Sequence, residues 1–149
     1  MKHKALRISI FVLVLFGAIT TIAGGVGLLT RAIATPQEWL QGSPFVDYNI
    51  PGLALAIIVG GSMLLAALTI LTGREIGVLA SAFAGLVIMI FEIIEVVVID
   101  PYAGSSLSVA LSLQIFFFAL GLAIFVLATT LWMIEFRRQH FPVKHLSHA

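Results

Sequence analysis

IGVLASAFAGLVIMIFEIIEVVVI, residues 76–99, contains only two charged side chains, those of Glu92 and Glu95. An α-helix rises about 1.5 Å per residue, so this stretch is long enough to cross a hydrocarbon core about 30 Å thick. Its apolar residues occupy nearly every face of such a helix, whereas a helix of a soluble bundle needs a polar outer face. The stretch therefore predicts a transmembrane helix.

Three further stretches of the same kind lie at residues 8–30, 51–73 and 107–134. Of the 149 residues, 60% are hydrophobic and only 10% are charged, and the mean hydropathy is +1.14. A soluble domain cannot bury so large an apolar fraction. We therefore predict an all-α fold, a four-helix transmembrane bundle with up-down-up-down topology, in which residues 1–149 form a single transmembrane domain.

The first apolar segment also has features of a cleaved secretory signal. Basic residues precede it, and Ala32-Ile33-Ala34 has the small side chains of a cleavage site. Its apolar region is, however, much longer than the roughly 7 to 15 residues of a signal core. We therefore expect a retained helix.

The basic residues predict the orientation of the bundle. Three of them precede the first predicted helix and three follow the last, whereas the loop of residues 31–50 contains only Arg31. Cytoplasmic segments of membrane proteins carry an excess of Lys and Arg. Both termini, including the tail of residues 135–149, are thus predicted to be cytoplasmic, and residues 31–50 and 100–106 are predicted to face outward.

Charge and cysteine content restrict the possible chemistry. The net charge is +1 and its basic residues are explained by topology, so we expect no nucleic-acid partner. The chain has no cysteine, which rules out a disulfide, a thiol nucleophile and a thiolate metal site. No cofactor or metal ion is expected.

The outward loop contains the signature of a short helix. Thr35 is placed to cap it, Pro36 suits its first position, and Glu38 can reach back to the cap. The helix should end near Gly42 and place Trp39 at the level of the lipid headgroups. We therefore predict a short interfacial helix in this loop.

The stretch SPFVDYNIPG, residues 43–52, follows this helix and contains two prolines that restrict its backbone. Because its backbone conformation is restricted, this connector is a candidate recognition surface. We select Trp39, Phe45, Asp47 and Tyr48 as its candidate recognition residues.

Two parts of the chain resemble a family of small four-helix bacterial integral membrane proteins of uncharacterised function. They are EWLQGSPFVDYNIPGLALAIIVGG, residues 38–61, and LQIFFFALGLAI, residues 113–124, and SPFVDYNIPG is their most specific part. The resemblance implies the four-helix architecture and a location in the bacterial cell membrane. It implies no activity, substrate or catalytic residue.

The two glutamates of residues 76–99 are the main candidates for a site. Gly77, Ser81 and Gly85 recur every four residues, a spacing that lets helix backbones approach closely. Glu92 lies seven residues beyond Gly85 and so falls almost on the same stripe, whereas Glu95 is displaced by about 60°. Glu92 is therefore expected to point into the bundle.

Gln114 is expected at a similar depth on the last helix, where its amide can donate to a carboxylate. Burial and the neighbouring Glu95 disfavour the charge of Glu92, which should be largely protonated. Two interpretations remain. Glu92, Glu95 and Gln114 can form an interhelical hydrogen-bond cluster that fixes packing, or the carboxylates, assisted by Asp47 and Asp100, can bind a proton, metal ion or cationic ligand.

The leading functional prediction is a non-catalytic, multi-pass structural or interaction component of the bacterial membrane. Its expected partners are the lipid bilayer and a second copy of the chain or another membrane protein. The alternative is a small proton- or cation-coupled transporter or ion-binding protein that uses Glu92 and Glu95. An enzyme with Glu92 as general acid or base ranks third, because no second catalytic group is recognisable.

Overall fold

The structure, a computed structural model, describes residues 3–98 and 107–137, with the side chains of residues 3–98 and 112–137. The described residues are helical apart from short connections, and four helices are long and apolar enough to cross a membrane. The prediction of an all-α chain with four such helices is therefore confirmed. Asp100, the loop of residues 100–106 and the tail beyond residue 137 lie outside the described residues.

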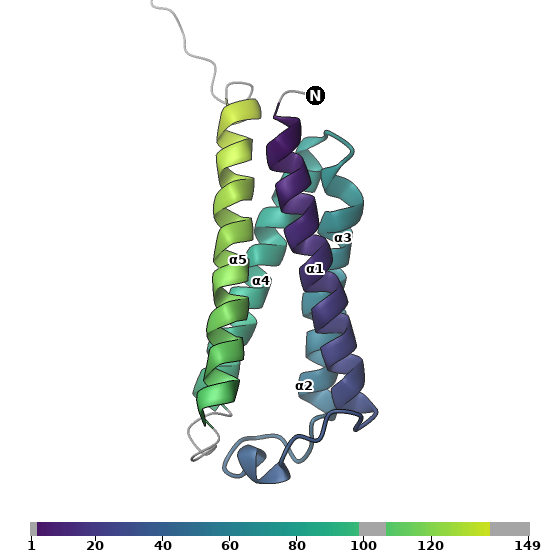
Figure 1. Cartoon of the computed structure of the whole chain (residues 1–149), viewed down its shortest axis with the longest axis vertical. Helices are drawn as coiled ribbons and strands as arrows, with labels where there is room; N and C mark the ends of the chain where they lie inside the picture. Colours follow the sequence, from purple (N-terminus) through teal and green to yellow (C-terminus); the bar gives the residue numbers. More distant parts are fainter. Residues whose placement is uncertain (1–2, 99–106, 138–149) are drawn as a thin grey trace, which may run out of the picture.

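The helices form a bundle with two distinct ends (Figure 1). One end contains the start of α1 (Lys4–Leu29), the turn between α3 (Gly60–Ile70) and α4 (Glu75–Val98), and the end of α5 (Leu107–Glu135). We call it the termini end. The opposite end contains the connection between α1 and α2, with the single turn η1, and is called the loop end. The remaining elements are η1 (Gln37–Leu40), α2 (Asn49–Leu53) and η2 (Ala54–Val59).

The second apolar stretch is not a uniform α-helix. α2 continues without interruption into η2, a π-helical segment, and then into α3, so that together they form one span, Asn49–Ile70. A π-helical segment arises where the hydrogen bonds run from i to i+5. Since this depends on how the backbone packs rather than on a residue signature, the uninterrupted apolar sequence gave no indication of it.

The short helix of the outward loop differs from the prediction. It is a single 3₁₀ turn, its N-cap is Pro36 rather than Thr35, no side chain caps it, and it ends before Gly42. The predicted capping by Thr35 and Glu38 is therefore wrong. The physical reason is that the turn begins one residue later than predicted, so that its N-cap is Pro36, which has no side-chain oxygen to accept a hydrogen bond.

Small residues allow the helices to cross closely. A Cβ atom at Gly85 of α4 would lie 2.7 Å from the carbonyl oxygen of Gly121 in α5, and a Cβ at Gly25 of α1 would lie 2.6 Å from that of Gly52. Real side chains do not fit into such distances, so only glycine permits these contacts. Gly77, Ser81 and Gly85 are all buried, so the predicted stripe of small residues serves packing within the chain.

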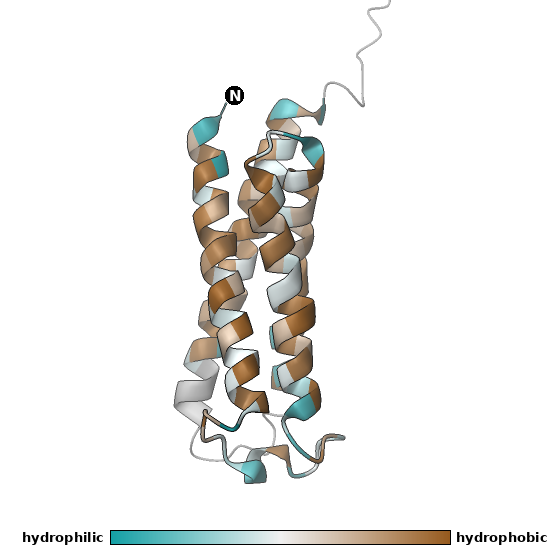
Figure 2. Cartoon of the chain, turned by 90° about the vertical axis from the view of Figure 1, so that its right-hand side faces the viewer, coloured by the Kyte–Doolittle hydropathy of each residue, from teal (hydrophilic) through white to brown (hydrophobic). Residues whose placement is uncertain are grey.

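Hydrophobic side chains both fill the bundle and cover it. Ile10, Val14, Met63 and Ile88 are among the fully buried core residues, while large apolar side chains such as Leu68 are exposed on the outer faces. Figure 2 shows hydrophobic residues along the length of the helices and hydrophilic ones gathered towards the two ends. This distribution matches a protein surrounded by lipid rather than by water.

Candidate functional site

At the termini end, a buried arginine ties three parts of the bundle together. Arg7 of α1 is 1% exposed, and its guanidinium forms an ion pair with Glu135 of α5. It also donates hydrogen bonds to the carbonyl oxygens of Ile70 (3.0 Å) and Gly73 (3.4 Å) at the end of α3. Arg7 is one of the three basic residues that precede the first predicted helix, and its burial was not predicted. Its position three residues before Ile10 and seven before Val14, on the buried face of α1, was the available signal.

A second polar contact lies at the same end. The indole N–H of Trp132 in α5 donates to Glu75 Oε1 at the start of α4, at 2.7 Å. We refer to Arg7, Glu75, Trp132 and Glu135 as the clasp. Its charged and polar groups are used to hold helices to one another, as expected for buried polar groups, so it is a structural feature rather than a binding site.

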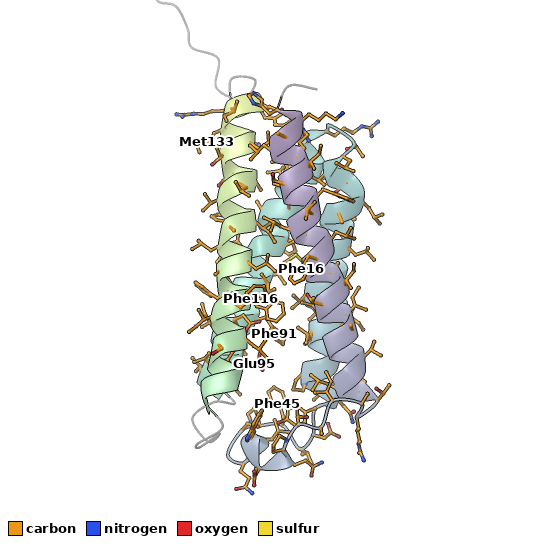
Figure 3. All side chains as sticks on the ribbon, in the orientation of Figure 1. Phe16, Phe45, Phe91, Glu95, Phe116 and Met133 are labelled. Atoms are coloured by element: carbon orange, nitrogen blue, oxygen red, sulfur yellow. The ribbon has the colours of Figure 1, made fainter. Side chains whose placement is uncertain are left out.

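The loop end contains a pocket of about 400 Å³ between α1, the α2–η2 segment, α4 and α5. Its walls are mostly apolar and include Leu28, Leu55, Val87, Phe91 and Ile94. The loop between α1 and α2 contributes Phe45, and Figure 3 shows Phe45, Phe91 and Glu95 gathered in this part of the bundle. The volume lies within the range of pockets that bind small molecules, about 300 to 1,000 Å³.

Two buried polar atoms in the pocket wall have no hydrogen-bond partner among the side chains and backbone that the structure describes. They are Nε1 of Trp39, a donor from η1, and Oε1 of Gln114, an acceptor from α5, which is itself only 8% exposed. Leaving such a group unsatisfied costs about 1 to 3 kcal/mol, and most buried polar groups in proteins are paired. A bound molecule that supplied an acceptor and a donor would satisfy both atoms.

Tyr48 connects the loop to the pocket. Its hydroxyl donates to the carbonyl oxygen of Pro36 at 2.9 Å, so the loop closes on itself. Burial raises the pKa of Tyr48 above its usual value of 10.0; the hydrogen bond with Thr35 opposes this rise, and the negative charge of Glu95 adds to it. Tyr48 is therefore neutral near pH 7, and Glu95 of α4 acts on it across the pocket.

The predicted site residues separate into two environments. Glu92 is 5% exposed and faces the interior, as the stripe of small residues predicted. Glu95 and Gln114 line the pocket, and Glu92 is absent from its wall. Residues three apart on a helix point in directions about 60° apart. The side chain of Glu92 therefore lies in the helix packing, whereas that of Glu95 lies in the pocket wall.

Three of the four candidate recognition residues of the loop also belong to the pocket. Trp39, Phe45 and Tyr48 line it. Asp47 does not; its Oδ1 accepts from the backbone N–H of Asn49 (3.0 Å) and its Oδ2 from the Asn49 side chain (2.6 Å), which fixes the start of α2. The loop therefore directs its aromatic residues inward, towards the bundle.

Comparisons of the chain with protein-family models, with curated proteins and with solved structures found no match. Within residues 3–98 and 107–137, no group of three or more His, Cys, Asp or Glu side chains is arranged to hold a metal ion.

The contribution of η2 to the pocket was not predicted from the sequence. Ala54, Leu55, Ile58 and Val59, all in the π-helical segment, line it. π-helical turns inside α-helices occur frequently at functional sites, because the extra residue redirects side chains locally. In this chain the π-helical segment lines the same pocket as the two unpartnered polar atoms, which adds to the case for a binding site.

Proposed function

We propose that this chain is a non-catalytic, multi-pass component of the bacterial cell membrane that acts by binding a partner molecule in the loop-end pocket. The observation that carries the proposal is the pair of buried, unpartnered atoms, Trp39 Nε1 and Gln114 Oε1, in one apolar pocket. The contrast with the clasp supports it, because the polar groups of the termini end are engaged with one another.

The proposal includes an orientation. Both termini are cytoplasmic, the four spans run up-down-up-down, and η1 lies at the outer membrane surface. The distribution of basic residues supports this orientation, since they flank the first and last spans. Trp39 in η1 also suits the interfacial region, where indole rings are enriched. The pocket is then in the outer half of the membrane.

Filling the pocket tests the proposal. Ala54 of η2 lines the pocket, so Ala54→Phe should obstruct it, whereas Ala23 is on the exposed face of α1 and Ala23→Phe is the matched control. Protein extracted together with its surrounding lipid is washed, and the molecules that remain bound are quantified by mass spectrometry. We expect a molecule retained by the wild type and by Ala23→Phe, and reduced about tenfold in Ala54→Phe. Equal retention by both variants would refute binding in the pocket.

A second candidate function is proton or cation binding by Glu92 and Glu95. The burial of Glu92 and the position of Glu95 in the pocket wall favour it, because acidic side chains inside a membrane often serve ion pathways. Replacing both residues with Gln distinguishes the two functions. An ion- or pH-dependent activity that disappears in this variant, while the retained molecule persists, would support the second candidate.

A further inference from the structure

We infer that the ligand of the loop-end pocket is a neutral, single-chain membrane amphiphile with a hydroxylated head group, of the monoacylglycerol type. This inference rests on the proposed function, since it names the class of molecule that the proposed site takes. It follows from four properties of the pocket: its volume, its opening, the chemistry of its unpartnered atoms and its charge.

The volume fits part of one hydrocarbon chain. The volume of about 400 Å³ lies towards the lower end of the range of small-molecule pockets, about 300 to 1,000 Å³. The walls are lined with aliphatic and aromatic side chains such as Leu55, Ile58, Val87 and Phe91. The pocket therefore takes part of one acyl chain rather than two chains, and the rest of a long chain extends through the opening towards the lipid.

The pocket opens on the face that lipid would cover. Ile50 and Ile58 of the second span and Ile90 and Ile94 of α4 line it, and each is more than half exposed. Residues that belong both to the wall and to the outer surface mark the mouth of a pocket. A ligand can therefore enter sideways from the bilayer, between the second span and α4.

The unpartnered atoms define the head group. Trp39 Nε1 can only donate a hydrogen bond, and Gln114 Oε1 can only accept one. The head group therefore has to provide both an acceptor and a donor. A hydroxylated glycerol ester provides both, an ester or ketone without hydroxyl groups leaves Gln114 Oε1 unpaired, and an ammonium group leaves Trp39 Nε1 unpaired.

Charge excludes an anionic head group. Glu95 lines the pocket, and neither Lys nor Arg appears among the described residues of its wall. A phosphate or carboxylate placed there would find no cationic side chain among the described residues of the wall, and an anion buried among apolar groups without a cationic partner is unfavourable. A neutral head group avoids this cost.

Quenching of tryptophan fluorescence by brominated lipids tests the inference. The full-length protein is reconstituted in phosphatidylcholine vesicles, and three probes with the same dibromostearoyl chain are added: the monoacylglycerol, the methyl ester and the free acid anion. Trp39 lies in the pocket, whereas Trp132 belongs to the clasp at the other end. We expect the monoacylglycerol to quench Trp39 at a mole fraction about tenfold lower than the other two probes need.

The Gln114→Leu variant tests the role of the acceptor. The loss of one hydrogen bond to a buried group should raise the mole fraction of monoacylglycerol needed for half quenching about tenfold. Gln41→Leu, at an exposed position of the loop, is the matched control and should leave it unchanged. Equal quenching by the methyl ester or the anion, or an unchanged Gln114→Leu variant, would overturn the inference.

The two proposals can fail separately. If Ala54→Phe loses a retained molecule but the monoacylglycerol shows no advantage over the other probes, the pocket binds a ligand of another class and only this inference falls. If none of the probes quenches Trp39 and Ala54→Phe retains as much as the wild type, both proposals fall.

Discussion

Replacement of Arg7 by methionine should destabilise the bundle severely. Arg7 is almost fully buried, pairs with Glu135, and donates to the carbonyl oxygens of Ile70 and Gly73. Methionine preserves much of the apolar volume but removes the charge and the donors. Removing one partner of a buried ion pair costs about 3 to 5 kcal/mol, and because Glu135 is 15% exposed and retains some access to water, we take the lower limit.

A loss of about 3 kcal/mol reduces the equilibrium constant for folding by roughly a hundredfold. The measurement is reversible unfolding in mixed micelles with increasing dodecyl sulfate, followed by far-ultraviolet circular dichroism. Lys4→Met is the matched control, because Lys4 is exposed in the same turn of α1, and it should change the unfolding free energy by less than about 0.5 kcal/mol.

The double variant Arg7→Met/Glu135→Leu separates a lost ion pair from a generally damaged helix. It removes the second charge as well, so it should recover at least about 1 kcal/mol relative to Arg7→Met alone. A loss below about 0.5 kcal/mol in Arg7→Met, or a double variant no more stable than Arg7→Met, would refute the role assigned to the clasp.

Three further predictions follow from packing, orientation and protonation. Gly85→Ala should cost about 1 to 3 kcal/mol in the same unfolding measurement, because its Cβ would meet the backbone of Gly121. Gly61→Ala is the control, since a Cβ there would meet no described atom within 4 Å outside its own stretch of helix backbone, and equal losses would contradict the close crossing. In this cysteine-free chain, Val46→Cys should react with an impermeant maleimide added to intact cells, whereas Arg74→Cys should react only after lysis; the reverse pattern would invert the proposed orientation. Because the pKa of Tyr48 is raised in the folded protein, the stability that its neutral hydroxyl contributes is complete below pH 10.0 and is lost as pH rises through the higher pKa of the folded state. The unfolding free energies of the wild type and Tyr48→Phe, measured against pH, should therefore diverge in that alkaline range. Superimposable curves would contradict the raised pKa.

The sequence was sufficient for the spans because length and apolarity decide them. The stripe of Gly77, Ser81 and Gly85 also placed Glu92 in the interior correctly, since helical periodicity links these positions. The sequence was not sufficient to predict the polar contacts at the ends of the bundle. Arg7 resembled an ordinary basic residue beside a membrane helix. Its spacing from Ile10 and Val14 indicated the buried face, but its pairing with Glu135, far along the chain, could not be predicted from local sequence.

The candidate site was predictable in part. Glu95, Gln114, Trp39, Phe45 and Tyr48 were all selected from the sequence, the first two as part of an intramembrane cluster and the other three as recognition residues of the loop. The structure brings them into a single pocket, because the loop folds its aromatic side chains inward. Neither the π-helical segment that helps to form the pocket nor the lack of a partner for Gln114 Oε1 has a local sequence signal.

The most direct test of the account compares the two tryptophans in one experiment. In ¹H–¹⁵N spectra of the protein in lipid nanodiscs, each indole N–H gives its own signal. Trp39 Nε1 is unpartnered in the pocket, whereas Trp132 Nε1 donates to Glu75 in the clasp. Addition of a monoacylglycerol should shift the Trp39 indole signal to higher proton frequency, as a hydrogen bond forms, and leave that of Trp132 in place. A stationary Trp39 signal, or equal shifts of both signals, would contradict a binding site at the loop end.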